Sequence, residues 1–232
     1  SRRIVFAEGE DERVIRAAQA ILEETTEVPI LIGRPDVIAL RCERAGLPIR
    51  PDRDFEIVNP QSDSRYRDYW ETYHRLMERR GVTPDTARAV LRTNTTAIGA
   101  VMVHRGEADS LICGAFGQYL WHLKYVEEVL ARDGLRPVGA LSLMIQDQGP
   151  LFIADTQAHA EPTPAQLADI VIGAARHVRR FGITPKIALC SSSQFGHLHT
   201  SSGLRMREAM ALLDAMPLAF AYGGEMTVDL AL

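Results

Sequence analysis

Cysteine is scarce in this sequence, with three among 232 residues: Cys42, Cys113 and Cys190. They are too widely separated for a disulfide framework, a Cys-x-x-Cys redox pair or a zinc-binding pair. Each lies among apolar residues, so we expect all three in the core. Free thiols are typical of a reducing compartment, and we therefore expect a cytoplasmic protein.

Long apolar runs are missing as well. The longest cover residues 138–145 and 151–154, whereas a membrane-spanning helix needs about 18–20 apolar residues. The first residues also contain no apolar signal segment. We therefore expect no membrane partner.

The sequence has no excess of positive charge. It contains 26 Lys and Arg against 30 Asp and Glu, a formal net charge of −4. A general nucleic-acid binder normally carries a basic face, so we expect no nucleic-acid partner. A local basic pocket for a phosphorylated small molecule remains compatible with this charge.

Short apolar segments alternate with helical patterns in the first half. Strands are predicted over residues 3–7, 28–33 and 55–58, with helices after Asp11 and from Pro35. This β-α-β-α-β order is the signature of a parallel sheet with helical crossovers. A long helix over 64–80 carries apolar and aromatic residues that we expect to pack on the sheet: Tyr66, Tyr69, Trp70, Tyr73, Leu76 and Met77.

The pattern changes near Asp133-Gly134, where we place a boundary between subdomains 1–133 and 134–232. The second subdomain begins with a predicted hairpin, 138–145 paired with 151–154. A mixed sheet is expected there, with further strands over 187–191 and 218–222. Glu225 and Asp229 are predicted on one face of a last helix that begins at the end of the sequence. We therefore expect a piece of a longer protein.

Two loops follow predicted strands and precede helices, where open α/β sheets bind ligands. The first contains Gly114, Gly117 and Gln118, and the second runs from Ser191 through Ser192 and Ser193 to Gly196. Hydroxyls and backbone N–H groups at such turns can hold phosphate or pantetheine. An ordinary polar loop is the alternative for the second.

Several catalytic classes lack their signature here. There is no Gly-x-Ser-x-Gly elbow and no phosphate-binding Walker loop. His197 and His199 have no third ligand nearby in the sequence, so we predict no metal site. No catalytic residue is predicted.

Further motifs run along the whole sequence in a fixed order. They are Glu8-Gly9 with Asp11 and Arg13, Gly106–Asp109 with Cys113–Ala115, Ala154-Asp155, residues 180–193, Arg207–Ala209, and Gly224–Met226 with Asp229. Together they resemble the phosphotransacetylase (phosphate acetyl/butyryltransferase) family. The resemblance implies an α/β fold of three α/β/α layers, similar to isocitrate dehydrogenase, with two subdomains flanking a cleft. It also implies that the first subdomain is incomplete, because the family's C-terminal segment returns to it.

The sequence departs from this family at the positions that hold phosphate. Lys124 stands where the family has a phosphate-binding arginine, and Met77 stands at a second arginine position. Lysine and arginine are not equivalent at a bidentate phosphate site. The family's catalytic Ser-Arg and Asp correspond to positions beyond residue 232.

Residues 75–84 and 113–117 resemble a subgroup, the degenerate C-terminal module of large bacterial NADP-dependent malic enzymes. The resemblance implies a regulatory domain that binds acetyl-CoA as effector and forms a homo-oligomer. NADP and a divalent metal would belong to an N-terminal malic enzyme region, with no cofactor in this chain. An active phosphate acetyltransferase and a ligand-free oligomerisation module are the alternatives.

The acyl-CoA ligand is expected in the cleft between the subdomains. The residues predicted to bind it are Gly114, Gly117, Gln118, Lys124, Ser191, Ser192, Ser193, Gly196 and Arg207.

Overall fold

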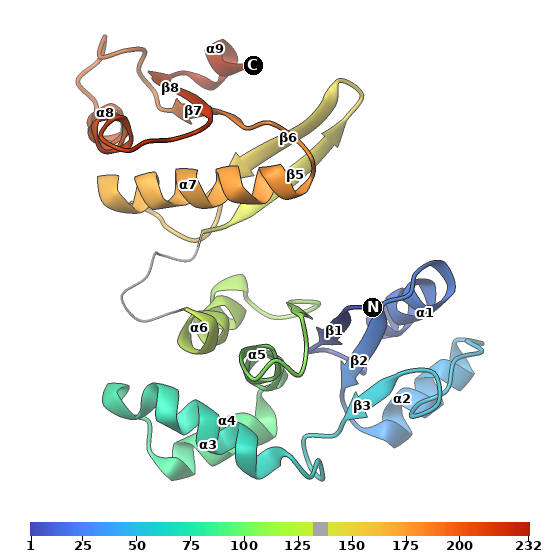
Figure 1. Ribbon diagram of the computed structural model, residues 1–232. Coiled ribbons are helices and arrows are strands. Elements are labelled where there is room, and N and C mark those ends of the chain that lie inside the picture. The colour runs from blue at the N-terminus through green and yellow to red at the C-terminus, as the bar shows by residue number, and fades with distance from the viewer. Residues whose placement is uncertain (132–138) are drawn as a thin grey trace. The chain divides into compact units, whose positions relative to one another are not determined.

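The computed structural model describes residues 1–131 and 139–232. The chain divides into two compact units, Ser1–Ala131 (unit 1) and Arg132–Leu232 (unit 2). The boundary predicted at Asp133-Gly134 and the predicted strand residue Val138 lie outside the described residues. Figure 1 shows the secondary structure of each unit.

Unit 1 is built on a parallel sheet of strand order β3-β2-β1-β4. Its elements are β1 (Arg3–Phe6), α1 (Glu12–Glu24), β2 (Val28–Ile32), α2 (Pro35–Arg44), β3 (Glu56–Val58), α3 (Tyr66–Met77), the 3₁₀ turn η1 (Glu78–Arg80), α4 (Pro84–Thr93), α5 (Thr95–His104), β4 (Ser110–Ile112) and α6 (Tyr119–Leu130). Capping side chains begin several helices: Asp11 accepts from the backbone of α1, Thr83 from α4 and Asn94 from α5. The predicted β-α-β-α-β order is confirmed.

The strands of unit 1 are apolar on both faces, so helices cover both. Phe6 and Leu31 pack with the residues of α1 and α2, while Val5 and Ile30 pack with those of α5. Figure 1 shows α1 and α2 on one side of the sheet and α5 on the other. Neighbouring residues of a strand point to opposite faces, and this alternation produces three layers.

Helix α3 does not lie directly on the sheet, contrary to the expectation. It packs against α4, α5 and α6, because α5 already covers that face. Tyr69, Tyr73 and Met77 are buried in the core that the helices share with the strands.

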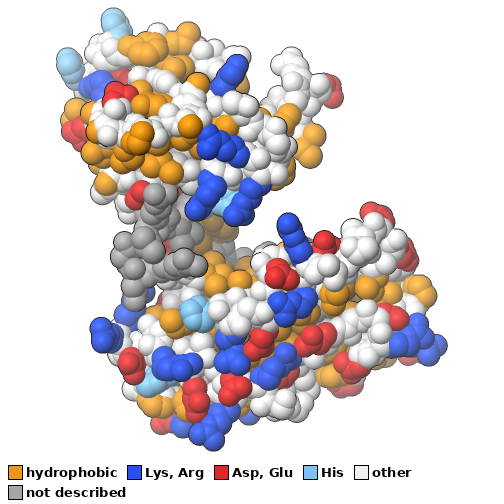
Figure 2. Space-filling view, viewed as in Figure 1, with side chains coloured by type: hydrophobic (Ala, Val, Ile, Leu, Met, Phe, Trp, Pro, Cys, Tyr) orange, Lys and Arg blue, Asp and Glu red, His pale blue; other side chains and the backbone are white. Residues whose placement is uncertain are grey.

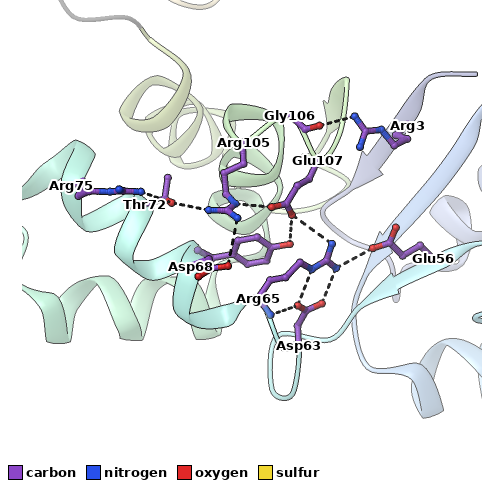
Figure 3. A network of polar contacts seen from close by, with 11 residues as sticks. Arg3, Glu56, Asp63, Arg65, Asp68, Thr72, Arg75, Arg105, Gly106 and Glu107 are labelled. Atoms are coloured by element: carbon purple, nitrogen blue, oxygen red, sulfur yellow. Dashed lines mark hydrogen bonds and ion pairs between the residues drawn. The ribbon is translucent and has the colours of Figure 1, made fainter.

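Polar groups fix one end of α3 (Figure 3). The guanidinium of Arg65 pairs with Asp63 at 2.9 Å and with Glu56 at 3.0 Å. The hydroxyl of Tyr69 donates to Glu107, which also pairs with Arg105 at 2.6 Å. The network therefore ties α3 to β3 and to the turn after α5. Over the visible face of unit 1, Lys and Arg side chains are interspersed with Asp and Glu (Figure 2).

Unit 2 contains a hairpin and a parallel strand pair. Its elements are β5 (Leu141–Gln146), β6 (Gly149–Ala154), α7 (Pro164–Arg180), β7 (Lys186–Cys190), α8 (Ser201–Asp214), β8 (Ala221–Met226) and α9 (Val228–Ala231). The predicted hairpin is β5–β6. The predicted mixed sheet is wrong for the described residues: β5–β6 and β7–β8 are separate pairs, and α7 packs against both.

The last strand lies later in the sequence than predicted. We expected it over 218–222, but β8 includes Glu225, which therefore shares no helix face with Asp229. The strand pairs in parallel with β7, with Gly224 opposite Leu189. A side chain at Gly224 would lie 2.6 Å from the carbonyl oxygen of Leu189, so glycine permits this close approach.

No helix within the described residues is long and apolar enough to cross a membrane. Among the cysteines, Cys42 is buried as expected, whereas Cys113 and Cys190 are partly exposed; all three are free thiols.

Candidate functional site

In unit 2, the predicted serine loop follows β7 and precedes α8. Its residues surround the carboxylate of Glu225, whose side chain is 0% exposed. Ser191 donates its hydroxyl hydrogen to Oε2 of Glu225. Oε1 of Glu225 accepts from the backbone N–H of Gly196 at 2.8 Å and from Nη1 of Arg207 at 2.7 Å. The structure thus brings three of the predicted site residues onto one buried carboxylate.

The carboxylate of Glu225 remains charged in this setting. Burial alone raises the pKa of Glu225, but hydrogen bonds from Ser191, Gly196, Ser193 and Arg207 outweigh burial and lower the pKa to about 2. Helix α8 can lie against this carboxylate because residue 203 is a glycine: an added Cβ there would lie 2.6 Å from Oε2 of Glu225. Because Glu225 is charged, it partly neutralises the positive charge of Arg207, which it contacts at 2.7 Å.

The serines of the loop face different surroundings. Ser193 is 2% exposed, and its hydroxyl oxygen accepts from the N–H of Leu198 at 3.0 Å. Ser192 is exposed, and its hydroxyl lies 3.4 Å from that of Thr200 and 3.3 Å from that of Ser202. Of the predicted serines, Ser192 presents its hydroxyl to solvent at the start of α8, while Ser191 and Ser193 hold the loop together.

In unit 1, the glycine loop after β4 rests on a buried polar cluster. The N–H of Gly114 donates to Oε1 of Glu8 at 3.1 Å. The ring of His122 lies 2.7 Å from the carbonyl oxygen of Phe116 and 2.8 Å from the hydroxyl of Thr96. Glu8, Thr96 and His122 are all buried. Direct contacts from Glu8 and His122 therefore hold the glycine loop in place, and Thr96 contacts the ring of His122.

The predicted glycines suit this loop. Gly114 and Gly117 have φ angles of +93° and +91°, a conformation that favours glycine. A side chain at Gly117 would also lie 3.2 Å from Nε2 of His122. Gln118 stands at the N-cap of α6, and its side chain makes no capping hydrogen bond.

Neither position of a family arginine presents a free cation. Lys124 is 60% exposed on α6, and its Nζ lies 3.8 Å from Oε1 of Glu128. Glu128 also accepts the hydroxyl hydrogen of Tyr73. Met77 is 4% exposed, and its side chain is part of the core of unit 1.

Sequence reasoning missed Thr96 and His122 in unit 1. It named Glu8 and Glu225 as parts of motifs, but it did not predict that their carboxylates anchor the two loops. The Gly223-Gly224 pair before Glu225 was the available signal, because consecutive glycines in a strand mark close backbone approach. Thr96 and His122 lie 26 positions apart and have no such local signal. In the described parts of the chain, no three His, Cys, Asp or Glu residues gather in a way that could hold a metal ion.

Known proteins resemble this chain over its whole length. Residues 1–232 match the Phosphate acetyl/butaryl transferase family. An NAD-dependent malic enzyme of Rhizobium meliloti is 50% identical over 99% of the chain, and an NADP-dependent malic enzyme of Salmonella typhimurium is 45% identical over 100%. The chain spans only 30% and 31% of the length of these two relatives.

A solved phosphotransacetylase from Streptococcus pyogenes has the same fold, with a TM-score of 0.89 and 26% identity. The match covers 100% of this chain and 70% of that one. The sequence motifs, the layered parallel sheet and these matches agree, and the chain belongs to the Phosphate acetyl/butaryl transferase family.

Proposed function

We propose that this chain is an acyl-CoA-responsive regulatory domain of a malic enzyme, without phosphate acetyltransferase activity of its own. The malic enzyme relatives, which the chain matches over one part of their length, support this proposal. The proposed effector is acetyl-CoA. NADP or NAD and a divalent metal would belong to the part of those relatives, N-terminal in our proposal, that this chain does not cover.

The observation that carries the proposal is the state of the two family-arginine positions. A phosphate acetyltransferase must hold phosphate beside the thioester while negative charge develops, and oriented cations stabilise that charge. Here Met77 is buried in the core and Lys124 is paired with Glu128. Losing one oriented donor costs about 10²–10³ in rate at comparable sites, so losing two leaves little activity.

Acetyl-CoA formation from acetyl phosphate and CoA tests the catalytic part of the proposal. We expect turnover far below ~1 s⁻¹, the low end for ordinary enzymes. A phosphotransacetylase assayed in parallel confirms that the substrates and detection work. Turnover near that value would establish the alternative, an active phosphate acetyltransferase.

For the effector, we propose contacts from the two loops and from Lys124. In this proposal, Ser192 and the N-terminal turn of α8 donate to phosphate or carbonyl oxygens of the effector, and the ammonium group of Lys124 exchanges Glu128 for an anionic group of the effector. Ser191, Gly196 and Arg207 act mainly by holding the loop on Glu225.

Calorimetry with acetyl-CoA tests this assignment. Lys124→Ala should weaken binding by about 1–3 kcal/mol, the usual worth of a hydrogen bond to a charged group. Lys186→Ala is the matched control, because Lys186 is also exposed but starts β7. Equal acetyl-CoA affinity in the parent and in both variants would show that Lys124 does not contact the ligand.

We also propose a homo-oligomer and a cytoplasmic location. Exposed apolar residues of the hairpin β5–β6, including Ile145, support the oligomer. The free thiols of Cys42, Cys113 and Cys190 support a reducing compartment.

A further inference from the structure

A pocket of about 630 Å³ lies at the carboxyl end of the unit 1 sheet. Its wall includes Ala7 after β1 and Gly33 after β2, together with Arg34 and Thr95 at the starts of α2 and α5. The volume falls within the ~300–1,000 Å³ of small-molecule sites. The carboxyl ends of parallel strands are also where α/β proteins bind ligands.

Two of the three acidic residues on the pocket wall are paired with arginines. Glu10 accepts from Nε and Nη2 of Arg34, each at 2.9 Å. Asp11 accepts from the same two nitrogens of Arg13 at 3.0 and 2.8 Å. These bidentate pairs neutralise the charges of Glu10 and Asp11. The third carboxylate on the wall, Glu8, is buried and accepts from the N–H of Gly114 at 3.1 Å.

Two arginines on the wall have no such partner in the described part of the chain. Arg92 stacks 3.5 Å from the ring centroid of Tyr66 and donates only to the carbonyl oxygens of Pro60 and Gln61. Arg41 is exposed and makes no side-chain hydrogen bond or ion pair among the described residues. Arg41 lies close enough to Glu10 and Asp11 to help lower their pKa values, but neither Arg41 nor Arg92 forms a direct ion pair among the described residues. Both guanidinium groups can therefore meet an anion in the pocket.

The remaining wall adds a positive field and an aromatic face. Helices α2 and α5 begin at the pocket, and helix N-termini favour negative charge. The side chain of Phe116 is 66% exposed and lines the same pocket. The wall therefore offers positive charge to a phosphate group and the exposed ring of Phe116 to a planar base.

We propose that this pocket binds a nucleotide, with its phosphates at Arg41 and Arg92 and its base against Phe116. The site lies wholly within unit 1. It shares the glycine loop, which contains Phe116, with the proposed acyl-CoA contacts, but Arg41 and Arg92 are not among those contacts. The inference therefore goes beyond the proposed function and does not depend on it.

Calorimetry of the full chain with ADP tests the inference, with pyrophosphate and adenosine as the two fragments. We expect ADP to bind at least tenfold more tightly than either fragment, since only ADP meets both parts of the pocket. Arg41→Gln should weaken ADP binding about tenfold, the effect of ~1.4 kcal/mol. Arg44→Gln, three positions further along α2 and outside the pocket, is the matched control and should bind ADP as the parent does.

Phe116 provides an independent test of the ring position. Phe116→Ala should weaken ADP binding about fivefold but leave pyrophosphate binding unchanged, and Phe116→Tyr should restore the parental affinity. All these residues are exposed or partly exposed, and unchanged thermal midpoints would confirm that the variants fold.

Absence of ADP binding, or equal ADP affinity in Arg41→Gln and Arg44→Gln, would overturn the inference. Acetyl-CoA itself contains an adenosine diphosphate group, so it is titrated in parallel into the parent and into Arg41→Gln. Acetyl-CoA affinity that Arg41→Gln leaves unchanged separates the pocket from the proposed effector site. Acetyl-CoA binding without ADP binding rejects the pocket and leaves the regulatory proposal standing. Binding of ADP that depends on Arg41, in a chain that does not bind acetyl-CoA, supports the pocket and contradicts the regulatory proposal.

Discussion

Glu225 is the residue on which the serine loop of unit 2 depends. Its carboxylate is fully buried and accepts from Ser191, Gly196 and Arg207. Removing its charge leaves these donors with a weaker partner. We expect Glu225→Gln to lower the free energy of unfolding by about 2 kcal/mol, within the range for hydrogen bonds to charged groups.

Urea denaturation at neutral pH measures this change. Asp229→Asn is the control, because Asp229 is an exposed carboxylate only four positions further along the chain. An unfolding midpoint of Glu225→Gln equal to that of Asp229→Asn would contradict the anchoring role.

The pKa of Glu225 also predicts how stability depends on pH. Hydrogen bonds outweigh burial and lower this pKa from the ordinary 4.5 to about 2 in the folded protein. The unfolded chain therefore binds the proton first on acidification, so the stabilisation is complete above about pH 4.5 and is lost as the pH falls toward about 2. Urea midpoints measured across this range should fall more steeply in the parent than in Glu225→Gln. Parallel curves for the two proteins would be evidence against a charged, hydrogen-bonded Glu225.

At the scale of elements, helix α8 approaches strand β8 closely because the residue of α8 that faces Glu225 is a glycine, Gly203. An added Cβ at Gly203 would lie 2.6 Å from Oε2 of Glu225 and 3.0 Å from Oγ1 of Thr200. Helix α7 also contains a glycine, Gly173, but an added Cβ there has no atom within 4 Å. The same substitution should therefore have opposite effects in the two helices.

We expect Gly203→Ala to destabilise the protein by about 1–3 kcal/mol, as overpacking does. Gly173→Ala should stabilise it by about 0.5–1 kcal/mol, the difference in helix propensity. Thermal unfolding followed by circular dichroism measures both. Stabilisation by Gly203→Ala would mean that α8 and Glu225 are not in contact in solution.

At the scale of the whole molecule, the hairpin β5–β6 has apolar side chains in solvent. Ile145 is 88% exposed and Met144 is 46% exposed, and no third strand joins this pair among the described residues. Exposed strand edges of this kind are usually covered in native proteins. We therefore expect the chain to self-associate.

Light scattering at micromolar concentration should give a mass above the 25.7 kDa of one chain. Ile145→Lys should shift the distribution toward that monomer mass by placing a charge on the hairpin. A single species of monomer mass in the parent would contradict the prediction.

The sequence by itself determined the order and type of most elements. Apolar spacing predicted the β-α-β-α-β opening and the hairpin, and the helix expected after Asp11 begins there, with the Asp11 side chain as its N-cap. These signals are local, because helix and strand periodicity and the caps depend on neighbours a few positions away. The motifs around Gly114 and Ser191 likewise identified the family that the full-length match shows.

Only the tertiary structure decided which groups meet. Spacing placed Glu225 on a helix face with Asp229, but pairing with β7 makes it a buried strand residue. Helix α3 packs against α5, and this packing buries Met77 in the core of unit 1. These outcomes depend on contacts between segments distant in sequence, where hydrogen bonding and close packing outweigh local pattern. For the same reason, only the folded unit shows that Arg41 and Arg92 line one pocket.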